Sequence, residues 1–442
     1  MKIAFVSLGC DKNLVDSEVM LGILSDAGFE ITDDEENADA AVVNTCCFIN
    51  DAKEESINTL LELAERKKSG QLKALVACGC LAQRYKKEIE EEIPEVDAIL
   101  GTTSIEDIAK AVEAALHKEH FCAMRELDYL PAGDRKRISS TGGYYGYLKI
   151  AEGCNKCCTY CIIPKIRGGY RSVPMEEILS SARKLVADGA KELILVAQET
   201  TLYGKDIYGE KRLPKLLHEL CRIEKLEWIR ILYCYPEEIT TELIEAIKSE
   251  PKVCHYLDIP IQHCSDRILK RMGRRTTKAD LEEKIALLRR ELPDIALRTT
   301  LITGFPGESE EDHEELLEFV EKMRFERLGI FTYSPEEGTL AAEMDGQIEE
   351  EVKQHRRDEL MQLQQEIAFA HAENMLFQTL PVMIEGYIPD EDVYVGRTYM
   401  DAPGVDGYIF VESRGTLVSG EFVPVKITDA RGYDLVGQIA EE

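Results

Sequence analysis

The chain has 442 residues, enough for two to four domains of about 100–200 residues, and it contains no apolar run of about 18 residues that could cross a membrane. Its 44% apolar and 31% charged residues exclude a disordered, collagen-like or fibrous chain. The formal net charge of −30 argues against broad binding to nucleic-acid phosphates and favours a basic protein surface as partner.

Residues 1–120 alternate short apolar runs with segments of helical periodicity. The runs KIAFVSLGC, AAVVNTC and ALVACGC each precede a helical pattern, which predicts βαβ units and an open parallel sheet. Each run ends in a cysteine: Cys10, Cys46 and Cys80. Ligands bind beyond the carboxyl ends of the strands in such sheets. We therefore expect these three cysteines to converge at one edge of the sheet.

The first apolar stretch is at the short limit for an export signal and is soon followed by acidic residues. We interpret it as a strand and expect a cytoplasmic protein. In a reducing compartment, clustered cysteines among the fourteen of this chain indicate metal binding or catalysis more often than disulfides.

Residues 121–141 lack periodicity and contain turn residues such as Pro131 and Gly133, which predicts a linker. In residues 142–376, strand-like apolar runs again alternate with helical segments. There are six such runs, from YGYLKIAEG to RLGIFTYSP, and a long helical pattern follows near the end. This order is typical of a full or partial β/α barrel, in which functional groups lie at the carboxyl ends of the strands. Residues 377–442 contain five short strand-like runs separated by turn signals, which predicts a small all-β barrel.

The segment from Cys154 to Cys161 holds four cysteines within eight residues. One interpretation is a zinc site made of all four thiolates, although zinc sites usually separate their cysteine pairs by a longer loop. The other is a 4Fe-4S cluster on Cys154, Cys158 and Cys161. Three ligands for four irons leave one iron open to chelate a small molecule, and Cys157 is then a bystander.

The sequence GCNKCCTYCIIPKIRGGYRS resembles the signature of radical S-adenosylmethionine enzymes, and more narrowly that of the methylthiotransferases. The resemblance continues through LGCDKNLVDSE, NTCCFI, CGCLAQRY, VAQETTLYG, LDIPIQHCSDRILKRMGRR, TTLITGFPGE and FTYSPEEGT. It covers essentially the whole chain and implies an N-terminal methylthiotransferase domain, a radical S-adenosylmethionine barrel and a C-terminal TRAM barrel.

The resemblance also implies two 4Fe-4S clusters and S-adenosylmethionine as cofactors. The catalytic cluster would lie on Cys154, Cys158 and Cys161, and the auxiliary cluster on Cys10, Cys46 and Cys80. Polar residues and glycines near strand ends or the cluster loop are expected to contact S-adenosylmethionine: Arg171, Gln198, Glu199, Gly304, Gly307 and Glu308. Arg167 and Arg171 lie beside the cluster loop and either bind a carboxylate of the cofactor or substrate or pair with surface acids. His263 and Asp266 are weaker candidates.

The implied reaction replaces an unactivated C–H bond by C–S–CH₃. No general base can deprotonate such a carbon at neutral pH. The reaction requires a radical that a cofactor supplies. By resemblance, the catalytic cluster cleaves S-adenosylmethionine, the auxiliary cluster carries the sulfur, and a second S-adenosylmethionine gives the methyl group. A low-potential electron donor and a sulfur donor are implied partners.

The family contains enzymes that modify an aspartate of ribosomal protein uS12 and enzymes that modify an adenosine in tRNA. The C-terminal segment 377–442 has four basic and twelve acidic residues, whereas an RNA-binding barrel would carry a basic face. Such an acidic barrel suits a basic ribosomal protein. We therefore expect uS12 as the substrate and no strong binding to nucleic acid, with tRNA as the alternative. A non-catalytic iron–sulfur scaffold is the rival from another class.

Overall fold

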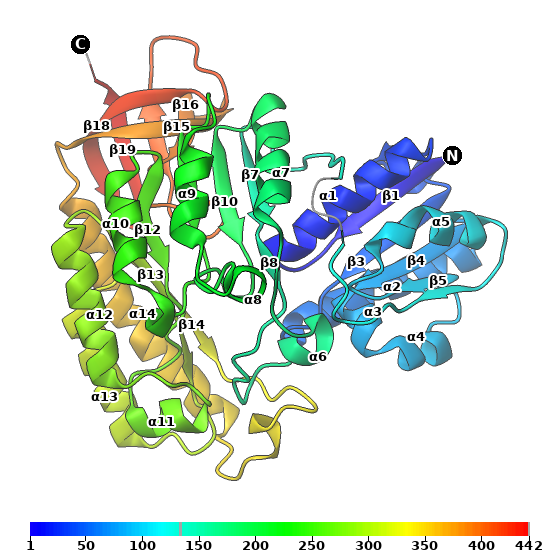
Figure 1. Cartoon of the computed structure of the whole chain (residues 1–442), viewed down its shortest axis with the longest axis horizontal. Coiled ribbons are helices and arrows are strands. Elements are labelled where there is room, and N and C mark those ends of the chain that lie inside the picture. The colour runs from blue at the N-terminus through cyan, green and yellow to red at the C-terminus, as the bar shows by residue number, and fades with distance from the viewer. Residues whose placement is uncertain (132–134, 441–442) are drawn as a thin grey trace.

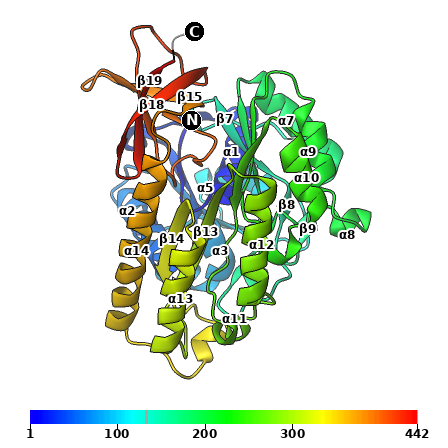
Figure 2. The same ribbon diagram turned by 90° about the vertical axis from the view of Figure 1, so that its left-hand side faces the viewer.

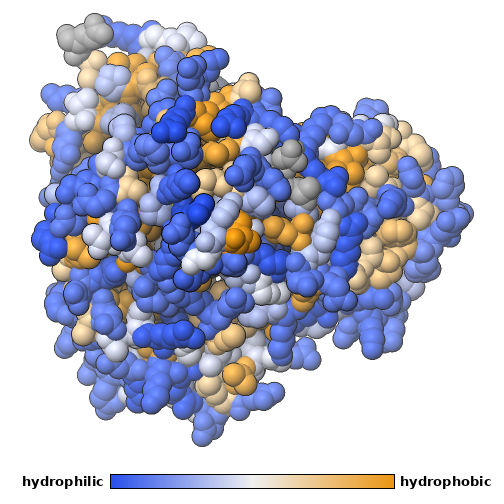
Figure 3. Space-filling view, in the orientation of Figure 1, coloured by the Kyte–Doolittle hydropathy of each residue, from blue (hydrophilic) through white to orange (hydrophobic). Residues whose placement is uncertain are grey.

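The computed structural model describes residues 1–131 and 135–440. Three parts follow one another along the chain: an N-terminal α/β domain, a larger central α/β domain, and a small β-barrel packed against the central sheet (Figure 1). In the space-filling view, the N-terminal domain forms a smaller lobe beside the larger one, with a notch between them on this face (Figure 3). None of the helices in these ranges is long and apolar enough to cross a membrane.

The N-terminal domain is a six-stranded parallel sheet in the order β2-β1-β3-β4-β5-β6. Its strands are β1 (Lys2–Ser7), β2 (Glu30–Thr32), β3 (Ala40–Thr45), β4 (Ala74–Gly79), β5 (Ala98–Leu100) and β6 (Phe121–Ala123). Its helices are α1 (Asp11–Asp26), α2 (Asn50–Lys68), α3 (Cys80–Arg84), α4 (Lys86–Glu92) and α5 (Ile108–Leu116). Separate apolar clusters pack α2, α3 and α4 on one face and α1 and α5 on the other.

The central domain is an open parallel sheet in the order β14-β13-β12-β11-β10-β7, so the barrel is partial. Its strands are β7 (Tyr145–Lys149), β10 (Glu192–Val196), β11 (Trp228–Ile231), β12 (Val253–Asp258), β13 (Ala296–Thr303) and β14 (Arg327–Thr332). The outer face of this sheet shares one apolar core with six helices (Figure 2). They are α7 (Met175–Ala187), α9 (Leu213–Cys221), α10 (Thr241–Ser249), α12 (Lys278–Glu291), α13 (Glu310–Met323) and α14 (Glu350–Glu373). Shorter elements are β8 (Ala151–Glu152), α6 (Ile163–Arg167), β9 (Arg171–Ser172), α8 (Lys205–Tyr208) and α11 (Asp266–Arg271).

The C-terminal part is a closed barrel in the order β15-β16-β17-β19-β18. Its strands are β15 (Thr379–Ile388), β16 (Val393–Arg397), β17 (Ile409–Glu412), β18 (Phe422–Arg431) and β19 (Asp434–Ile439). Its apolar residues share a core with the inner face of the central sheet, where the ring of Trp228 meets the ring of Phe422 edge to face at 4.7 Å. The small barrel thus lies against the concave side of the central sheet.

These three parts confirm the fold class expected from the sequence. One expectation needs correction: the irregular linker does not begin at residue 121, because Phe121–Ala123 form β6 and pair with β5. Three residues are too few to show strand periodicity in the sequence. Residues 132–134 of the expected linker and residues 441–442 of the expected small barrel lie outside the described ranges.

Candidate functional site

The three cysteines at the ends of β1, β3 and β4 lie at one edge of the N-terminal sheet. Cys10 precedes α1, Cys46 follows β3 and Cys80 begins α3. A Cβ on Gly9 would lie 2.6 Å from the Cβ of Cys46, and a Cβ on Gly79 would lie 2.6 Å from the carbonyl oxygen of the residue before Cys46. Both glycines have a positive φ, near 90°. Glycine before Cys10 and before Cys80 is therefore what allows the three chain segments to approach so closely.

Arg167, at the end of α6, connects this cysteine edge with the central domain. Its guanidinium donates to the Oδ1 of Asn13 at 2.5 Å, to Asp16 at 2.7 Å and to Glu152 at 3.2 Å. Its Nη2 also lies 3.5 Å from the Sγ of Cys80. Arg167 is buried and its charge is neutralised by these carboxylates, so it bridges the two domains rather than reaching into an open space. Sequence reasoning missed Asn13, whose place beside the first cysteine in CDKN was the available signal.

The second cysteine group lies on a loop that the short antiparallel pair β8–β9 closes. Cys154 and Cys158 are buried, and Cys161 is half-buried at the start of α6. Cys157 is exposed and has a positive φ of 55°, with its thiol facing the backbone of its own loop. The loop therefore turns three of its cysteines inward and one outward. A Cβ on Gly153 would lie 2.1 Å from a backbone oxygen on the other side of the loop, so its start is tightly packed.

Burial raises the pKa of four of these thiols, those of Cys46, Cys80, Cys154 and Cys161. The pKa is raised to about 11 at Cys154 and to about 12 at Cys161 and Cys80, although the guanidinium beside Cys80 opposes the effect there. These thiols are protonated at neutral pH, so binding iron must release protons. Within residues 1–131 and 135–440, no three Cys, His, Asp or Glu side chains lie together in a group that could hold a single metal ion. Three thiolates on a 4Fe-4S cluster each bind a different iron, and soft thiolates are the ligands that such clusters take.

Gln198 and Glu199 follow β10 at its carboxyl end, beside the cluster loop. The side chain of Gln198 accepts from the backbone N–H of Gly153 at 2.8 Å and donates to Glu152 at 2.6 Å, so it braces the loop. Glu199 is fully buried, and burial raises its pKa to about 7. Its Oε2 has no hydrogen-bond partner in the described residues and lies 3.8 Å from the Nζ of Lys156. A buried carboxylate oxygen without a donor fits the ammonium group of S-adenosylmethionine.

The glycine-containing loop after β13 packs against the protein itself. A Cβ on Gly304 would meet the side chain of Lys353 at 2.3 Å, and one on Gly307 would meet Arg271 at 3.1 Å. Glu308 accepts from Arg356 at 2.9 Å and from the backbone N–H of Phe305 at 3.1 Å. These residues hold the loop in place, and their contact with S-adenosylmethionine stays a prediction.

The remaining candidates also have local partners. Arg171 donates to the carbonyl oxygens of Gly169 at 2.5 Å and Arg167 at 3.1 Å. His263 is buried and its Nδ1 accepts from the backbone of Ser265. Asp266 accepts from the backbone N–H that opens α12. Arg171 thus contacts the returning end of the cluster loop, whereas these contacts of His263 and Asp266 do not reach that loop or Glu199.

A cavity of about 260 Å³ lies between the two cysteine loops. Phe48 and Ile49, just after Cys46, line one side, and Tyr160, between Cys158 and Cys161, lines another. Residues at the carboxyl ends of β12, β13 and β14 complete the wall: Gln262, Thr300, Ile302, Phe331, Thr332, Tyr333, Ser334 and Glu336. These wall residues lie within the motifs that carry the family resemblance, but the motifs alone did not show that the fold brings them together around one cavity.

The two domains also contact each other directly at this place. Ile162 and Ile166 of the segment after Cys161 share an apolar cluster with Cys80. At the opposite edge of the central sheet, Arg84 of α3 donates to Glu336 at 2.9 Å. These contacts join the N-terminal domain to the segment after Cys161 and to the segment after β14.

Three family models match successive parts of the chain. Residues 2–101 match the uncharacterized protein family UPF0004, residues 148–320 match the radical SAM superfamily, and residues 378–440 match the TRAM domain. The expected three-part organisation is thus found in known families as well as in the fold.

Similar proteins cover the full length of the chain. The ribosomal protein uS12 methylthiotransferase RimO of Lachnoclostridium phytofermentans is 64% identical over 99% of both chains. The protein of the same name in Clostridioides difficile is 50% identical over 100% of this chain and 99% of its own. Among solved structures, the radical S-adenosylmethionine methyltransferase TsrM of Kitasatospora setae, with cobalamin and a 4Fe-4S cluster bound, has a TM-score of 0.55. At 15% identity over 77% of each chain, it shows a shared fold.

Proposed function

Because this chain belongs to the family of ribosomal protein uS12 methylthiotransferases, we propose that it adds a methylthio group to the β-carbon of an aspartate in uS12. The family is the one that the cysteine motifs indicated, and its members are radical S-adenosylmethionine enzymes. When bound, the two clusters and S-adenosylmethionine supply the radical that removes the hydrogen, the sulfur atom and the methyl group.

The observation that carries this proposal is the cavity bordered by both cysteine loops. A substrate carbon has to meet the group held by Cys154, Cys158 and Cys161 and also the group held by Cys10, Cys46 and Cys80. Phe48 and Tyr160 belong to these two loops and line the same space of about 260 Å³. We therefore expect the aspartate side chain of the substrate to enter this cavity, which residues next to both cysteine groups border.

The chain's own residues bind and orient the reactants. The two cysteine sets would hold the clusters, and Glu199 would accept from the ammonium group of S-adenosylmethionine through its Oε2, which has no hydrogen-bond donor in the described residues and lies 3.8 Å from the Nζ of Lys156. Arg167 and Gln198 keep the loops in register by their contacts with Asp16 and Gly153. The rings of Phe48 and Phe331 border the cavity and are 46% and 53% exposed, so a bound substrate has to cover them before water is excluded from the reacting carbon.

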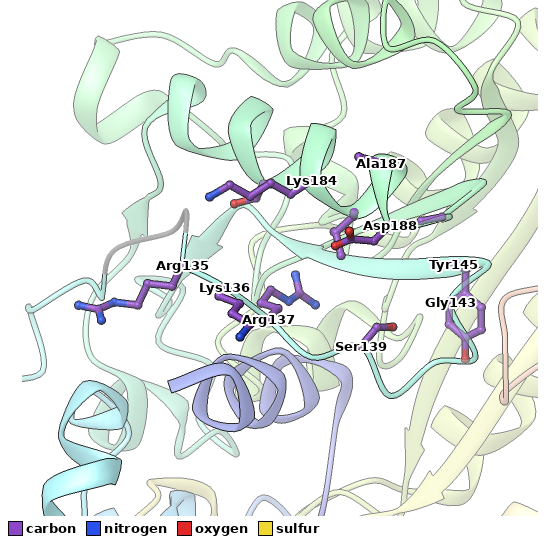
Figure 4. Close-up of a pocket in the computed structure, with 12 residues that line it drawn as sticks. Arg135, Lys136, Arg137, Ser139, Gly143, Tyr145, Lys184, Ala187 and Asp188 are labelled. Atoms are coloured by element: carbon purple, nitrogen blue, oxygen red, sulfur yellow. The ribbon is translucent and has the colours of Figure 1, made fainter. Parts of the chain in front are cut away.

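The basic segment 135–137, which could bind RNA, is already neutralised. The linker arginines and lysine border a cavity of about 360 Å³ beside α7 (Figure 4). Arg135 pairs with Glu106, Lys136 with Asp26, and Arg137 with Glu18. These pairs favour a protein substrate over tRNA.

The C-terminal barrel supports the same choice. Its Arg397 is buried and paired with Glu385, so it adds no surface charge. Three consecutive acids, residues 390–392, are exposed at the turn between β15 and β16. This turn offers an acidic contact for a basic ribosomal protein. The proposal places the reaction in the cytoplasm, where ribosomal proteins are made, with a low-potential electron donor and a sulfur donor as further partners.

The test is to incubate the reconstituted enzyme with uS12 and, separately, with the adenosine-modified tRNA. We expect uS12 to gain the mass of one CH₂S unit on an aspartate and tRNA to stay unchanged. A gain on tRNA alone would reject the proposed substrate. Absence of 5′-deoxyadenosine from enzyme with both clusters loaded, S-adenosylmethionine and dithionite would favour a non-catalytic scaffold.

A further inference from the structure

Arg274 is a buried arginine for which the described residues offer no carboxylate partner. It is 7% exposed, and its Nε and Nη1 have no hydrogen-bond acceptor. Its Nη2 donates to the carbonyl oxygen of Pro260 at 2.8 Å. The other buried arginines of the described ranges all form ion pairs with carboxylates: Arg167, Arg230, Arg356 and Arg397.

An unpaired buried guanidinium is costly. Removing a charge from water is compensated only when an opposite charge and hydrogen-bond acceptors replace the water. The chain carries 83 acidic residues, so a carboxylate partner was readily available in the sequence, yet none in the described part forms an ion pair with Arg274, and Glu237 acts on it only from a longer distance. Two free donors on a buried cation point to an anionic ligand that arrives from outside the chain.

Arg274 lies directly against the loop that carries Cys158. The backbone N–H of Thr159 donates to the carbonyl oxygen of Met272, two residues before Arg274, at 3.0 Å. The guanidinium lies 4.4 Å from the centre of the Tyr235 ring, and the hydroxyl of Tyr235 lies 3.8 Å from the Sγ of Cys158. The free donors of Arg274 are thus held next to the proposed catalytic cluster.

The same tyrosine is connected to Glu199. The backbone N–H of Tyr235 donates to the hydroxyl of Thr201, and the backbone N–H of Thr201 donates to Glu199 at 3.0 Å. Arg274, with two free donors, therefore lies over the Tyr235 ring, and Glu199 lies near the backbone of the same tyrosine, with its Oε2 3.8 Å from the Nζ of Lys156. An amino acid zwitterion, with one carboxylate and one ammonium group, matches this pair of charges.

We propose that Arg274 binds the carboxylate of the methionyl part of S-adenosylmethionine, while Glu199 binds its ammonium group. The inference deepens the proposed function, on which its choice of ligand rests. A planar guanidinium with two free N–H donors can bind a carboxylate through two parallel hydrogen bonds, which fixes the orientation of the methionyl group as well as its affinity.

The test compares S-adenosylmethionine with decarboxylated S-adenosylmethionine in equilibrium dialysis against the anaerobic enzyme with both clusters loaded. For Arg274→Gln we expect binding of S-adenosylmethionine to weaken roughly 10- to 100-fold and binding of the decarboxylated compound to stay the same. Arg274→Lys keeps the positive charge and should lose less affinity for S-adenosylmethionine than Arg274→Gln. Arg275→Gln is the matched control, since Arg275 is the exposed neighbour, and it should bind both compounds like the wild type.

An equal loss for both compounds in Arg274→Gln would overturn the proposal, because Arg274 would then support the cluster or the fold. Unchanged binding of S-adenosylmethionine would overturn it as well. If Arg274→Gln does not fold, the wild type and Arg274→Lys decide: equal binding of the two compounds by the wild type contradicts the proposal. Dialysis needs no uS12, so it separates the two proposals. If the uS12 assay fails but binding depends on the carboxylate and on Arg274, uS12 is rejected as the substrate and the role of Arg274 stands.

Discussion

At the scale of single residues, the spacing of the cysteines left two ligand sets open, and the backbone favours one of them. Four cysteines within eight residues fit either a four-thiolate zinc site or three thiolates on a cluster. The structure turns Cys157 outward with a positive φ of 55° and keeps Cys154 and Cys158 buried. This arrangement supports the three-ligand interpretation, which a spacing pattern alone does not distinguish.

The difference between Cys157 and Cys158 can be tested directly. We expect Cys158→Ala to lose the iron of the catalytic cluster and the cleavage of S-adenosylmethionine, because it removes one of three inward thiols. Cys157→Ala should retain both, since its thiol is exposed. Iron content and 5′-deoxyadenosine release, measured anaerobically with dithionite, give the two readouts. If the two variants exchange behaviour, the ligand assignment is wrong.

At the scale of elements, strands with long apolar runs were predictable and short ones were not. The six strands of the central sheet and the five of the small barrel were expected, because runs of β-branched and apolar residues alternate with turn or helix signals. The strands β2, β5 and β6 were missed, since each has three residues. The cluster loop was located by its motif, but its shape depends on packing between backbones, which the sequence shows only as glycines.

Gly153 sets that shape, and Gly153→Ala should displace the loop. The new Cβ would lie 2.1 Å from the carbonyl oxygen of Gly169 and 2.6 Å from that of Gly168, at a φ of 79°. We expect this variant to lose the iron held by the cluster loop, measured after reconstitution in a background where Cys10, Cys46 and Cys80 are alanine.

Gly209→Ala is the control for the backbone conformation alone. Gly209 has nearly the same φ of 78°, but nothing lies within 4 Å of a Cβ there. The substitution should cost about 1 kcal/mol of unfolding free energy and leave the iron content unchanged. Equal iron loss in both variants would show that strain in φ, rather than the close approach of two backbones, governs the loop.

At the scale of the whole molecule, the sequence predicted the three parts but not how they pack. Glu192, Arg230 and Arg397 are completely buried between the central sheet and the small barrel, although the last of them lies 205 residues from the first. Charged residues inside strands look like exposed positions in a sequence, and only the fold shows that they neutralise one another. The same holds for the cavity between the cysteine loops, whose walls come from both domains.

This buried ionic group makes the attachment of the small barrel dependent on pH. Glu192 pairs with Arg230 and with Arg397, each at 2.7 Å. Burial alone would raise the pKa of Glu192, but the two guanidinium groups outweigh it and hold the pKa below the usual value of 4.5. The stabilisation is therefore fully present above about pH 5 and is lost as the pH falls through the lowered pKa of the folded state.

Replacing Glu192 by glutamine should remove this stabilisation at every pH, because it leaves two buried guanidinium groups without their shared carboxylate. We expect a loss of roughly 3–5 kcal/mol in unfolding free energy at pH 7 and a weaker pH dependence than in the wild type. The fluorescence of Trp228, the one tryptophan of the chain, is the measurement, since its ring contacts Phe422 of the small barrel. Asp429→Asn, which breaks an exposed pair with Arg431, should cost no more than about 1 kcal/mol. If both variants unfold like the wild type, the buried group does not hold the small barrel to the central sheet, and the apolar contacts alone must do so.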